Sequence, residues 1–275
     1  MEGLTVSGKF AGKTVIVTGS SRGIGRAIAL RFATKGAEVV IHGQNVEKLK
    51  ETTQVLKELG VLEKNYLVIQ GAIQEQETQD KVINETIKKF GKIDVLVNNV
   101  GVSHKGGLNP ESAENMDFLY QVNLRSIYTL TNSAIPHLSK TKGNIINISS
   151  VGSQKAHDYF MPYSILKAAI DHFTRGAALK YAKDGIRVNT VSPGSVESDF
   201  VSRHGGDDEM TKAIAEKWAN LFVPLKRAGK PDEVASLVLF VASDEASYIT
   251  GTNMMVDGGA MAGIPTENWL KHSST

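Results

Sequence analysis

Short apolar runs rich in β-branched residues alternate along the chain with longer segments whose apolar residues recur every three or four positions. The runs, which predict strands, lie at 13–18, 37–42, 65–70, 92–99, 143–149, 185–192 and 253–257. The periodic segments, which predict helices, lie near 23–35, 45–59, 74–90, 111–138, 162–183 and 231–243. This alternation predicts an α/β fold, a doubly wound parallel sheet of about seven strands with helices on both faces.

The length of 275 residues suits one large α/β domain, so we expect residues 1–275 to form a single domain. Segment 194–230 is the one long stretch outside the alternation. Long irregular segments of compact domains are often functional lids, so we expect it to cover a site. The tail, 263–275, follows the last predicted strand and has no assigned role.

Composition and charge exclude several classes of function. Without cysteine the chain has no disulfide, catalytic thiolate or cysteine-ligated metal, and its seven histidines lack the spacing of metal ligands, so no metal is expected. Its 31 Lys and Arg are interleaved with 29 Asp and Glu, so nucleic acid is not an expected partner. No apolar run is long enough to span a membrane, and no apolar leader opens the chain. We expect a soluble, cytoplasmic protein.

The segment TGSSRGIG (18–25) places three glycines where the first predicted strand passes into the first predicted helix. Without side chains, glycines let backbone N–H groups and the helix N-terminus approach a pyrophosphate. The glycines could instead serve only the close packing of the helix on the sheet. Their place at the start of an alternating β/α chain favours a dinucleotide site. The contacts expected from this turn are those of Gly19, Ser21, Arg22, Gly23, Ile24 and Gly25.

Tyr163 and Lys167 stand four residues apart in a predicted helix, so their side chains share one face. A nearby ammonium favours the phenolate and brings the pKa of a tyrosine, about 10 when unperturbed, toward working pH. The pair could also be two surface residues that meet by chance. Ser150, thirteen residues before Tyr163 at the end of a predicted strand, and Asn123 further upstream favour chemistry.

Six motifs in this order resemble the short-chain dehydrogenase/reductase family, in its single-domain branch, from about Phe10 to about Gly259. They are TGSSRGIG (18–25), NNVG (98–101), VNLRS (122–126), NISS (147–150), YSILK (163–167) and SPGSVES (192–198). The resemblance implies a Rossmann-like fold. It also implies an oxidoreductase that moves hydride between a nicotinamide cofactor and a ketone or secondary alcohol.

The resemblance implies a role for each of four residues. Tyr163 would be the general acid for reduction and the general base for oxidation, and Ser150 would polarise the substrate oxygen. Lys167 would bind the nicotinamide ribose and lower the pKa of the tyrosine, and Asn123 would hold a water of a proton relay. Ser149 competes for the serine role, but the spacing of thirteen residues selects Ser150.

Further cofactor contacts follow from the resemblance, at the ends of the later strands. They are Ile73, Asn98, Gly101, Pro193, Gly194, Val196 and Ser198. Three positions depart from the family pattern. Ala72 stands where a carboxylate usually meets the adenine, Val100 adds bulk where Ala is usual, and Ser198 replaces the usual Thr.

The cofactor preference depends on the end of the second strand, VVIHGQN (39–45). A carboxylate there would bind the ribose 2′-OH of NAD and repel a 2′-phosphate, and none is present. Arg22 could reach the phosphate with its guanidinium, so the sequence favours NADP(H), with His42 and Gln44 beside it. Because many relatives with this preference have a basic residue where Gln44 stands, NAD(H) stays open.

Only a few residues indicate the class of substrate and the oligomeric state. Aromatic residues such as Phe160 and Trp218 favour an apolar carbonyl or alcohol, although Trp218 and Phe222 could simply pack a lid helix. The last strand resembles one that builds a tetramer in relatives, so a homo-oligomer is expected.

The alternatives to an oxidoreductase are a non-catalytic dinucleotide-binding regulator, a sugar-nucleotide epimerase and a methyltransferase. The first would lose Tyr163 or Lys167, the second usually adds a larger C-terminal region, and the third does not need this pair.

Overall fold

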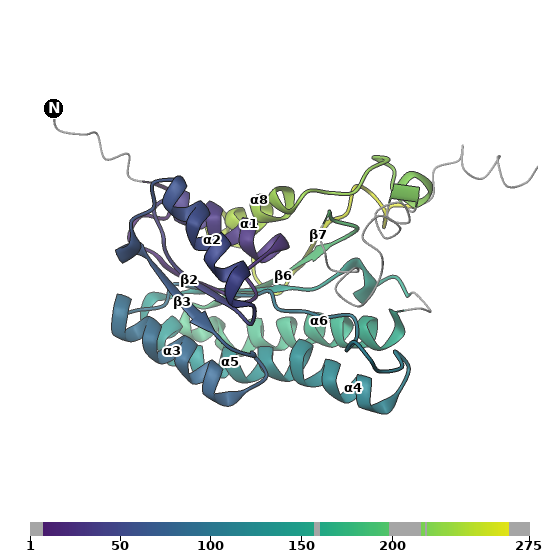
Figure 1. Ribbon diagram of the computed structural model, residues 1–275, viewed down its shortest axis with the longest axis horizontal. Coiled ribbons are helices and arrows are strands. Elements are labelled where there is room, and N and C mark those ends of the chain that lie inside the picture. The colour runs from purple at the N-terminus through teal and green to yellow at the C-terminus, as the bar shows by residue number, and fades with distance from the viewer. Residues whose placement is uncertain (1–7, 157–159, 198–215, 218, 264–275) are drawn as a thin grey trace, which may run out of the picture.

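The computed structural model describes residues 8–156, 160–197, 216–217 and 219–263. They form a seven-stranded sheet in the order β3-β2-β1-β4-β5-β6-β7, in which every neighbouring pair is parallel (Figure 1). Its strands are β1 (Thr14–Val17), β2 (Glu38–Gly43), β3 (Tyr66–Gln70), β4 (Val95–Asn98), β5 (Asn144–Ile148), β6 (Arg187–Pro193) and β7 (Asn253–Val256). The predicted doubly wound parallel sheet is confirmed, because helices cover both faces.

The helices follow the predicted segments closely. They are α1 (Gly23–Thr34), α2 (Val46–Glu58), α3 (Gln76–Phe90), α4 (Ala113–Tyr120), α5 (Ser126–Thr141), α6 (Met161–Tyr181) and α8 (Pro231–Ala242). Figure 1 shows α1, α2 and α8 on one face of the sheet and α3, α4, α5 and α6 on the other. Within the described ranges, no helix is both long and apolar enough to cross a membrane.

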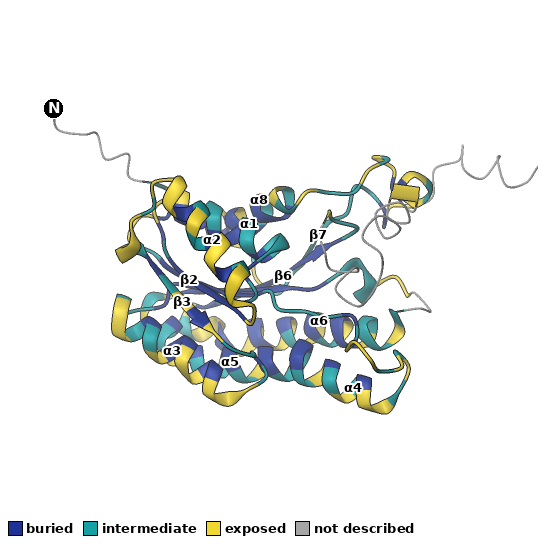
Figure 2. Ribbon diagram, viewed as in Figure 1, coloured by how far each residue is buried: buried dark blue, intermediate teal, exposed yellow. Residues whose placement is uncertain are grey.

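Two apolar cores, one on each face, hold the sheet between the helices. Along β1, Val15 and Val17 belong to the core shared with α1 and α8, and Ile16 belongs to the core shared with α3 and α5. Successive side chains of a strand point to opposite faces, so this alternation follows from the pleat. All three are fully buried. Figure 2 shows dark blue, the colour of buried residues, along much of the sheet. The continuous apolar runs of the sequence therefore reflect burial on both sides.

Local side-chain chemistry sets several helix ends. Asn45 caps α2 by accepting a hydrogen bond from the Lys48 N–H at 2.9 Å, and Ser112 caps α4 in the same way. Helix α3 ends at Gly91, whose φ of +78° lies in the left-handed region that glycine adopts most readily.

The periodic segment 111–138 is not one continuous α-helix. Between α4 and α5 the chain makes a π-helical turn over Gln121–Arg125. Asn123, at its centre, binds the backbone of Val102 at both ends of its amide: Oδ1 accepts from the N–H at 2.9 Å and Nδ2 donates to the carbonyl at 2.8 Å. Wide turns of this kind are frequent at functional sites.

The expected lid, 194–230, is described only at its two ends, because 198–215 and Trp218 lie outside the described residues, as does most of the tail. Val196 and Gly229 form an isolated parallel bridge, and the Glu197 N–H donates to the Gly229 carbonyl at 2.8 Å. The two ends of the segment are therefore fastened to each other.

Candidate active site

Most of the predicted site residues lie at one edge of the sheet. Parallel strands bring their carboxyl ends together, and the glycine turn follows β1, His42 lies in β2, and Ser150 follows β5. This edge is where open parallel sheets bind their ligands. The fold thus gathers residues that are far apart in the chain.

The glycine turn is packed so closely that its glycines are required. Gly19 and Gly23 have φ values of +65° and +54°. A Cβ on Gly25 would stand 2.4 Å from both the Gly19 carbonyl oxygen and Asn99 Nδ2. Asn99 Nδ2 donates to the Thr18 carbonyl at 2.9 Å and to that of Gly19 at 3.2 Å. Asn99 is therefore a residue of this turn that sequence reasoning missed, although the NNVG motif contains it.

The first turn of α1 is open to an anion. Among the described side chains none caps this helix, and its first turn contains no acidic residue. Ser21 is buried behind the turn, and a Cβ on Gly43 would meet its Oγ at 2.8 Å, so only glycine at the end of β2 lets the turn pack there. Ile24 is half-buried and packs on the core below. Backbone N–H groups at such a helix start suit a pyrophosphate.

His42 lies behind the glycine turn rather than at the surface. It is almost fully buried, and its Nδ1 accepts a hydrogen bond from the Gly19 N–H at 3.2 Å. Burial lowers the pKa of His42 to about 4, and the backbone of Gly71 acts in the opposite direction. The side chain is therefore neutral at physiological pH and offers no charge to a 2′-phosphate. It supports the turn, which differs from the direct cofactor contact expected from the sequence.

The residues left for the ribose phosphate are Arg22 and Gln44. Arg22 is half-buried in an extended backbone conformation just before α1. Gln44 is exposed beyond β2, and its carbonyl accepts from Gln70 Nε2 at 3.3 Å. Arg22 is the cation that the sequence predicts for this corner.

Ser150 and Tyr163 meet at the end of β5. Ser150 Oγ accepts a hydrogen bond from the Gly152 N–H at 3.1 Å and is also hydrogen-bonded to Tyr163. Ser149, the competing serine, is buried, and its Oγ donates to the carbonyl of Lys167 at 3.1 Å. The geometry therefore favours Ser150, the serine selected by spacing. Phe160 packs against Tyr163 with ring centroids 6.5 Å apart.

Lys167 is buried one helical turn after Tyr163. Its Nζ donates to the Ile148 carbonyl at 2.8 Å and lies 5.4 Å from the centre of the Tyr163 ring. A Cβ on Gly101 would stand 3.3 Å from this Nζ and 3.7 Å from Asn123 Oδ1. Tyr163, Lys167, Gly101 and Asn123 thus form one contiguous group.

Burial dominates the titration of this group. It raises the pKa of Tyr163 to about 12, against a smaller lowering by the hydrogen bond with Ser150. It also lowers the pKa of Lys167 to about 8, against the raising effect of the Asp171 charge. The phenol therefore stays protonated through the physiological range, which suits a general acid. The lowering of the tyrosine pKa expected from Lys167 does not contribute to this shift, whose one lowering cause is the hydrogen bond with Ser150.

Two expected contacts from the strand ends have their side chains turned inward. Asn98 is buried, with Nδ2 donating to Asn147 Oδ1 at 2.8 Å and to Thr131 Oγ1 at 3.2 Å. The Ile73 side chain lies in the core, and its carbonyl accepts from Gln79 Nε2 at 2.9 Å. A contact of either residue with a cofactor would have to use remaining backbone groups.

The turn after β6 is held against the end of β7. The Gly194 N–H donates to the Val256 carbonyl at 2.9 Å, and a Cβ at this glycine would stand 2.9 Å from the Asp257 Cα. Pro193 ends β6 in the buried sheet, and Val196 lies in the bridge to Gly229. Ser198 lies outside the described residues.

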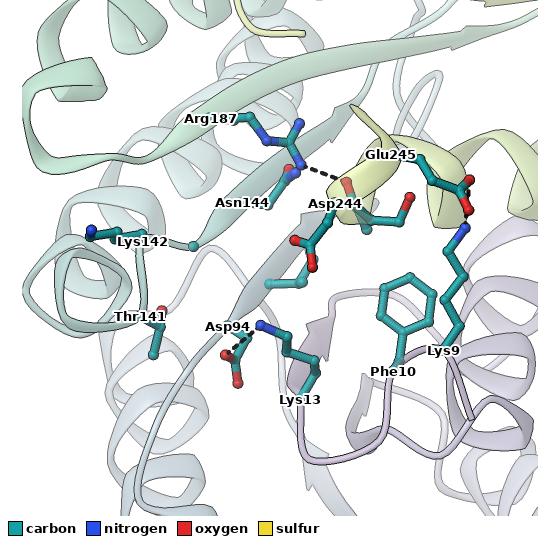
Figure 3. A pocket seen from close by; sticks show the side chains of 14 residues that line it. Lys9, Phe10, Lys13, Asp94, Thr141, Lys142, Asn144, Arg187, Asp244 and Glu245 are labelled. Atoms are coloured by element: carbon teal, nitrogen blue, oxygen red, sulfur yellow. Dashed lines mark hydrogen bonds and ion pairs between the residues drawn. The ribbon is translucent and has the colours of Figure 1, made fainter. Parts of the chain in front are cut away.

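A separate pocket of about 250 Å³ lies at the opposite edge, near the amino ends of β1, β4, β5 and β6. Two ion pairs lie along it: Lys9 with Glu245 at 2.8 Å and Lys13 with Asp94 at 3.7 Å, as Figure 3 shows. No residue predicted for the site lines this pocket. In the part of the chain that the structure describes, no group of acidic and histidine side chains could hold a metal.

Comparison with known proteins identifies the family of the chain. A family model described as enoyl-(acyl carrier protein) reductase matches residues 19–261. A crystal structure of a Caenorhabditis elegans short-chain dehydrogenase/reductase of unknown function, solved with cofactor, is 39% identical with a TM-score of 0.90 and covers 94% of this chain and 99% of its own. L-fucose dehydrogenase of Bos taurus is 36% identical and covers 93% of this chain and 92% of its own. The 3beta-hydroxysteroid dehydrogenase 1 of Eggerthella lenta is 35% identical, and the match covers 90% of this chain and 93% of its own.

Proposed function

Since the chain belongs to the short-chain dehydrogenase/reductase family of oxidoreductases, we propose that it is an NADP(H)-dependent enzyme that interconverts a ketone and a secondary alcohol. The observation that carries the proposal is the contiguous group formed by Ser150, Tyr163 and Lys167 at the carboxyl edge of the sheet. A dinucleotide-binding regulator would not need this group.

The residues present fit a nicotinamide dinucleotide. The glycine turn offers the start of α1 to the pyrophosphate, and the close packing of Gly25 leaves no room for a side chain. Lys167 has three ammonium hydrogens, of which the Ile148 carbonyl takes one, so further donors remain for the ribose hydroxyls. When bound, the cofactor supplies or accepts the hydride.

The proton is handled by the chain's own side chains. In reduction, Tyr163 donates the phenolic proton to the carbonyl oxygen while Ser150 donates a hydrogen bond to the same oxygen. In oxidation, the phenolate takes the proton from the alcohol. The positive charge of Lys167 stabilises the phenolate that forms. The Asn123 side-chain amide is fixed by its two hydrogen bonds to Val102, and we propose that the backbone carbonyl of Asn123 in the π-helical turn holds the relay water.

We assign the preference for NADP(H) to Arg22. The buried part of the β2 end, His42 and Gly43, carries no charge at neutral pH, and the exposed Gln44 is an uncharged donor. A guanidinium suits a phosphate by its fork geometry. Without a second cation, we expect the preference over NAD(H) to be moderate.

The proposed substrate is an apolar carbonyl or alcohol, supported by Phe160 beside Tyr163 and by Phe222 in the part of the lid region that packs near Ala260. The relatives named above act on a sugar and on a steroid, so both classes belong in a first screen. The family model names an enoyl reductase, and an enoyl thioester is therefore a second candidate.

We further propose that the chain is a homo-oligomer and that the tetramer expected from the sequence is its form. Family members are generally oligomeric, and large apolar side chains such as Tyr128, Ile165 and Leu179 are exposed on α5 and α6. Tyr248 is exposed beside β7, which is an edge strand and so can pair with another chain. We also propose one domain over residues 1–275 and a cytoplasmic location.

The test is turnover of the purified protein with NADPH or NADH against a ketone, a sugar, a 3-ketosteroid and an enoyl thioester, followed by nicotinamide absorbance. We expect turnover of a ketone or its alcohol. Ser150→Ala should then lose far more activity than the neighbouring Ser149→Ala. Turnover of the enoyl thioester alone, or an equal loss in both variants, would contradict the proposed carbonyl chemistry.

A further inference from the structure

Asp171 continues the face of α6 that carries Tyr163 and Lys167. The three residues are spaced by four, so Asp171 lies one turn beyond Lys167, at about 5–6 Å between Cβ atoms in a regular helix. Its side chain is 5% exposed, although it carries a carboxylate. None of the family motifs in the sequence includes it.

Hydrogen bonds within the described chain satisfy only part of this carboxylate. Asp171 Oδ2 accepts from Asn253 Nδ2 at 2.7 Å, and Asn253 stands in β7 opposite Thr190 of β6. Among the described residues, Oδ1 is buried and has no hydrogen-bond partner. A buried carboxylate with so few hydrogen bonds is costly unless a cation lies near it. Lys167 and Arg175 each stand four residues from Asp171 on α6, and of the two Lys167 is the one that is buried.

The buried ammonium of Lys167 requires a negative charge nearby to stay protonated. The residue is 2% exposed, and burial alone disfavours the charged form of its ammonium. The groups packed around it are uncharged: the Ile148 carbonyl and Ser149 from the end of β5, Gly101 from the loop after β4, and Asn123 from the π-helical turn. The titratable groups that face it are Tyr163 and Asp171, both from α6.

We propose that Asp171 is a positioning residue of the active site: its carboxylate, fixed by Asn253 of β7, keeps Lys167 positively charged beneath Tyr163. The inference rests on the proposed function, because it acts through the roles given there to Lys167 and Tyr163. Proton transfer at Tyr163 then depends on the carboxylate of Asp171, which acts through the charge of Lys167.

The test is an NMR titration of Lys167 in protein labelled with ¹³C at the lysine Cε, with the signal assigned by its loss in Lys167→Arg. We expect the midpoint near pH 8 to fall by about one unit in Asp171→Asn, since an opposite charge at this range shifts a pKa by about 1–3 units. Asp171→Ser is a second uncharged variant if the first does not fold. An unchanged midpoint in a folded variant would overturn the proposal.

Asn253→Ala separates charge from structure, because it removes the hydrogen bond and keeps the carboxylate. We expect its Lys167 midpoint to stay within a few tenths of the wild-type value. If Asn253→Ala instead lowered the midpoint as much as Asp171→Asn, the effect would come from the contact between α6 and β7, and the proposal would be wrong. The titration needs no substrate, so a failure of the proposed carbonyl chemistry would appear separately, as normal turnover in Tyr163→Phe.

Discussion

The ammonium of Lys167 lies over the face of the Tyr163 ring, with Nζ 5.4 Å from the ring centroid, while it donates a hydrogen bond to the Ile148 carbonyl at 2.8 Å. Both groups are buried, and burial moves the two pKa values in opposite directions, up to about 12 for the phenol and down to about 8 for the ammonium. Both groups are therefore mainly protonated at pH values well below 8.

The pH dependence of ketone reduction should follow Lys167. Tyr163 keeps its proton well above neutrality, whereas Lys167 loses its charge as the pH rises through about 8. The developing phenolate then loses its nearby cation, so kcat for reduction should fall above about pH 8. In Lys167→Arg the guanidinium keeps its charge, and the residual activity should show no fall there. A fall at the same pH in both enzymes would exclude Lys167 as its origin.

His42→Ala should weaken dinucleotide binding although the imidazole is behind the glycine turn. The Gly19 N–H would lose its acceptor, which costs about 1–3 kcal/mol for a buried donor. We expect a lower midpoint of thermal unfolding and NADPH binding weakened by about fivefold or more. His42→Asn is the matched control, since its amide oxygen can accept at the position of Nδ1. Equal losses in the two variants would show that the hydrogen bond to Gly19 is not the cause.

Arg22→Ala should weaken NADPH binding by about tenfold and leave NADH binding nearly unchanged, because a charge-assisted hydrogen bond to phosphate is worth about 1.5–3 kcal/mol. Gln44→Arg should act in the opposite direction. Fluorescence titration with both nucleotides measures each effect. Arg26→Ala is the control: it removes a charge from the same helix, where Arg26 Nη1 lies 3.8 Å from Glu51 Oε2. A similar loss of NADPH affinity in this control would show that Arg22 acts only through the overall positive charge of this region and not through a contact with the phosphate.

Gly25→Ala should disrupt the glycine turn. The new Cβ would stand 2.4 Å from the Gly19 carbonyl oxygen, so the backbone of the turn would have to move. We expect loss of measurable NADPH binding and reduced thermal stability. In Gly176→Ala, also within a helix, the added Cβ meets nothing within 4 Å, and the change should stabilise by up to about 1 kcal/mol. Normal NADPH binding by Gly25→Ala would show that the turn tolerates a side chain.

The fold was predictable because strands that are buried on both faces of the sheet are rich in apolar residues, and such runs are easily seen in the sequence. Runs such as 37–42 and 143–149 are rich in Val and Ile, and the strands lie within a residue or two of them. The break in segment 111–138 was not predictable, since it accompanies a contact between the Asn123 side chain and Val102, twenty-one residues away. Hydrophobic periodicity records which face is buried and not how the backbone turns within a helix.

The site residues that follow a fixed sequence spacing were predictable. Those whose role depends on the direction of the side chain were less so. Tyr163, Lys167 and Ser150 come together as expected. Asn98 and Asn99 are adjacent, and the side chain of Asn98 turns into the sheet while that of Asn99 meets the glycine turn. The burial of His42 and the consequent loss of its charge depend on α2, β3 and the turn all packing around it, which no local pattern encodes.

The measurement that tests the central claim most directly is the comparison of Tyr163→Phe with the wild type, with NADPH binding and turnover recorded on the same preparations. The variant lacks the phenolic proton and keeps the ring that packs against Phe160 and lies under Lys167. We expect an unchanged dissociation constant for NADPH and turnover reduced by about 10²–10⁴-fold, the contribution of general acid-base catalysis. Near-normal turnover in a variant that binds NADPH normally would contradict it.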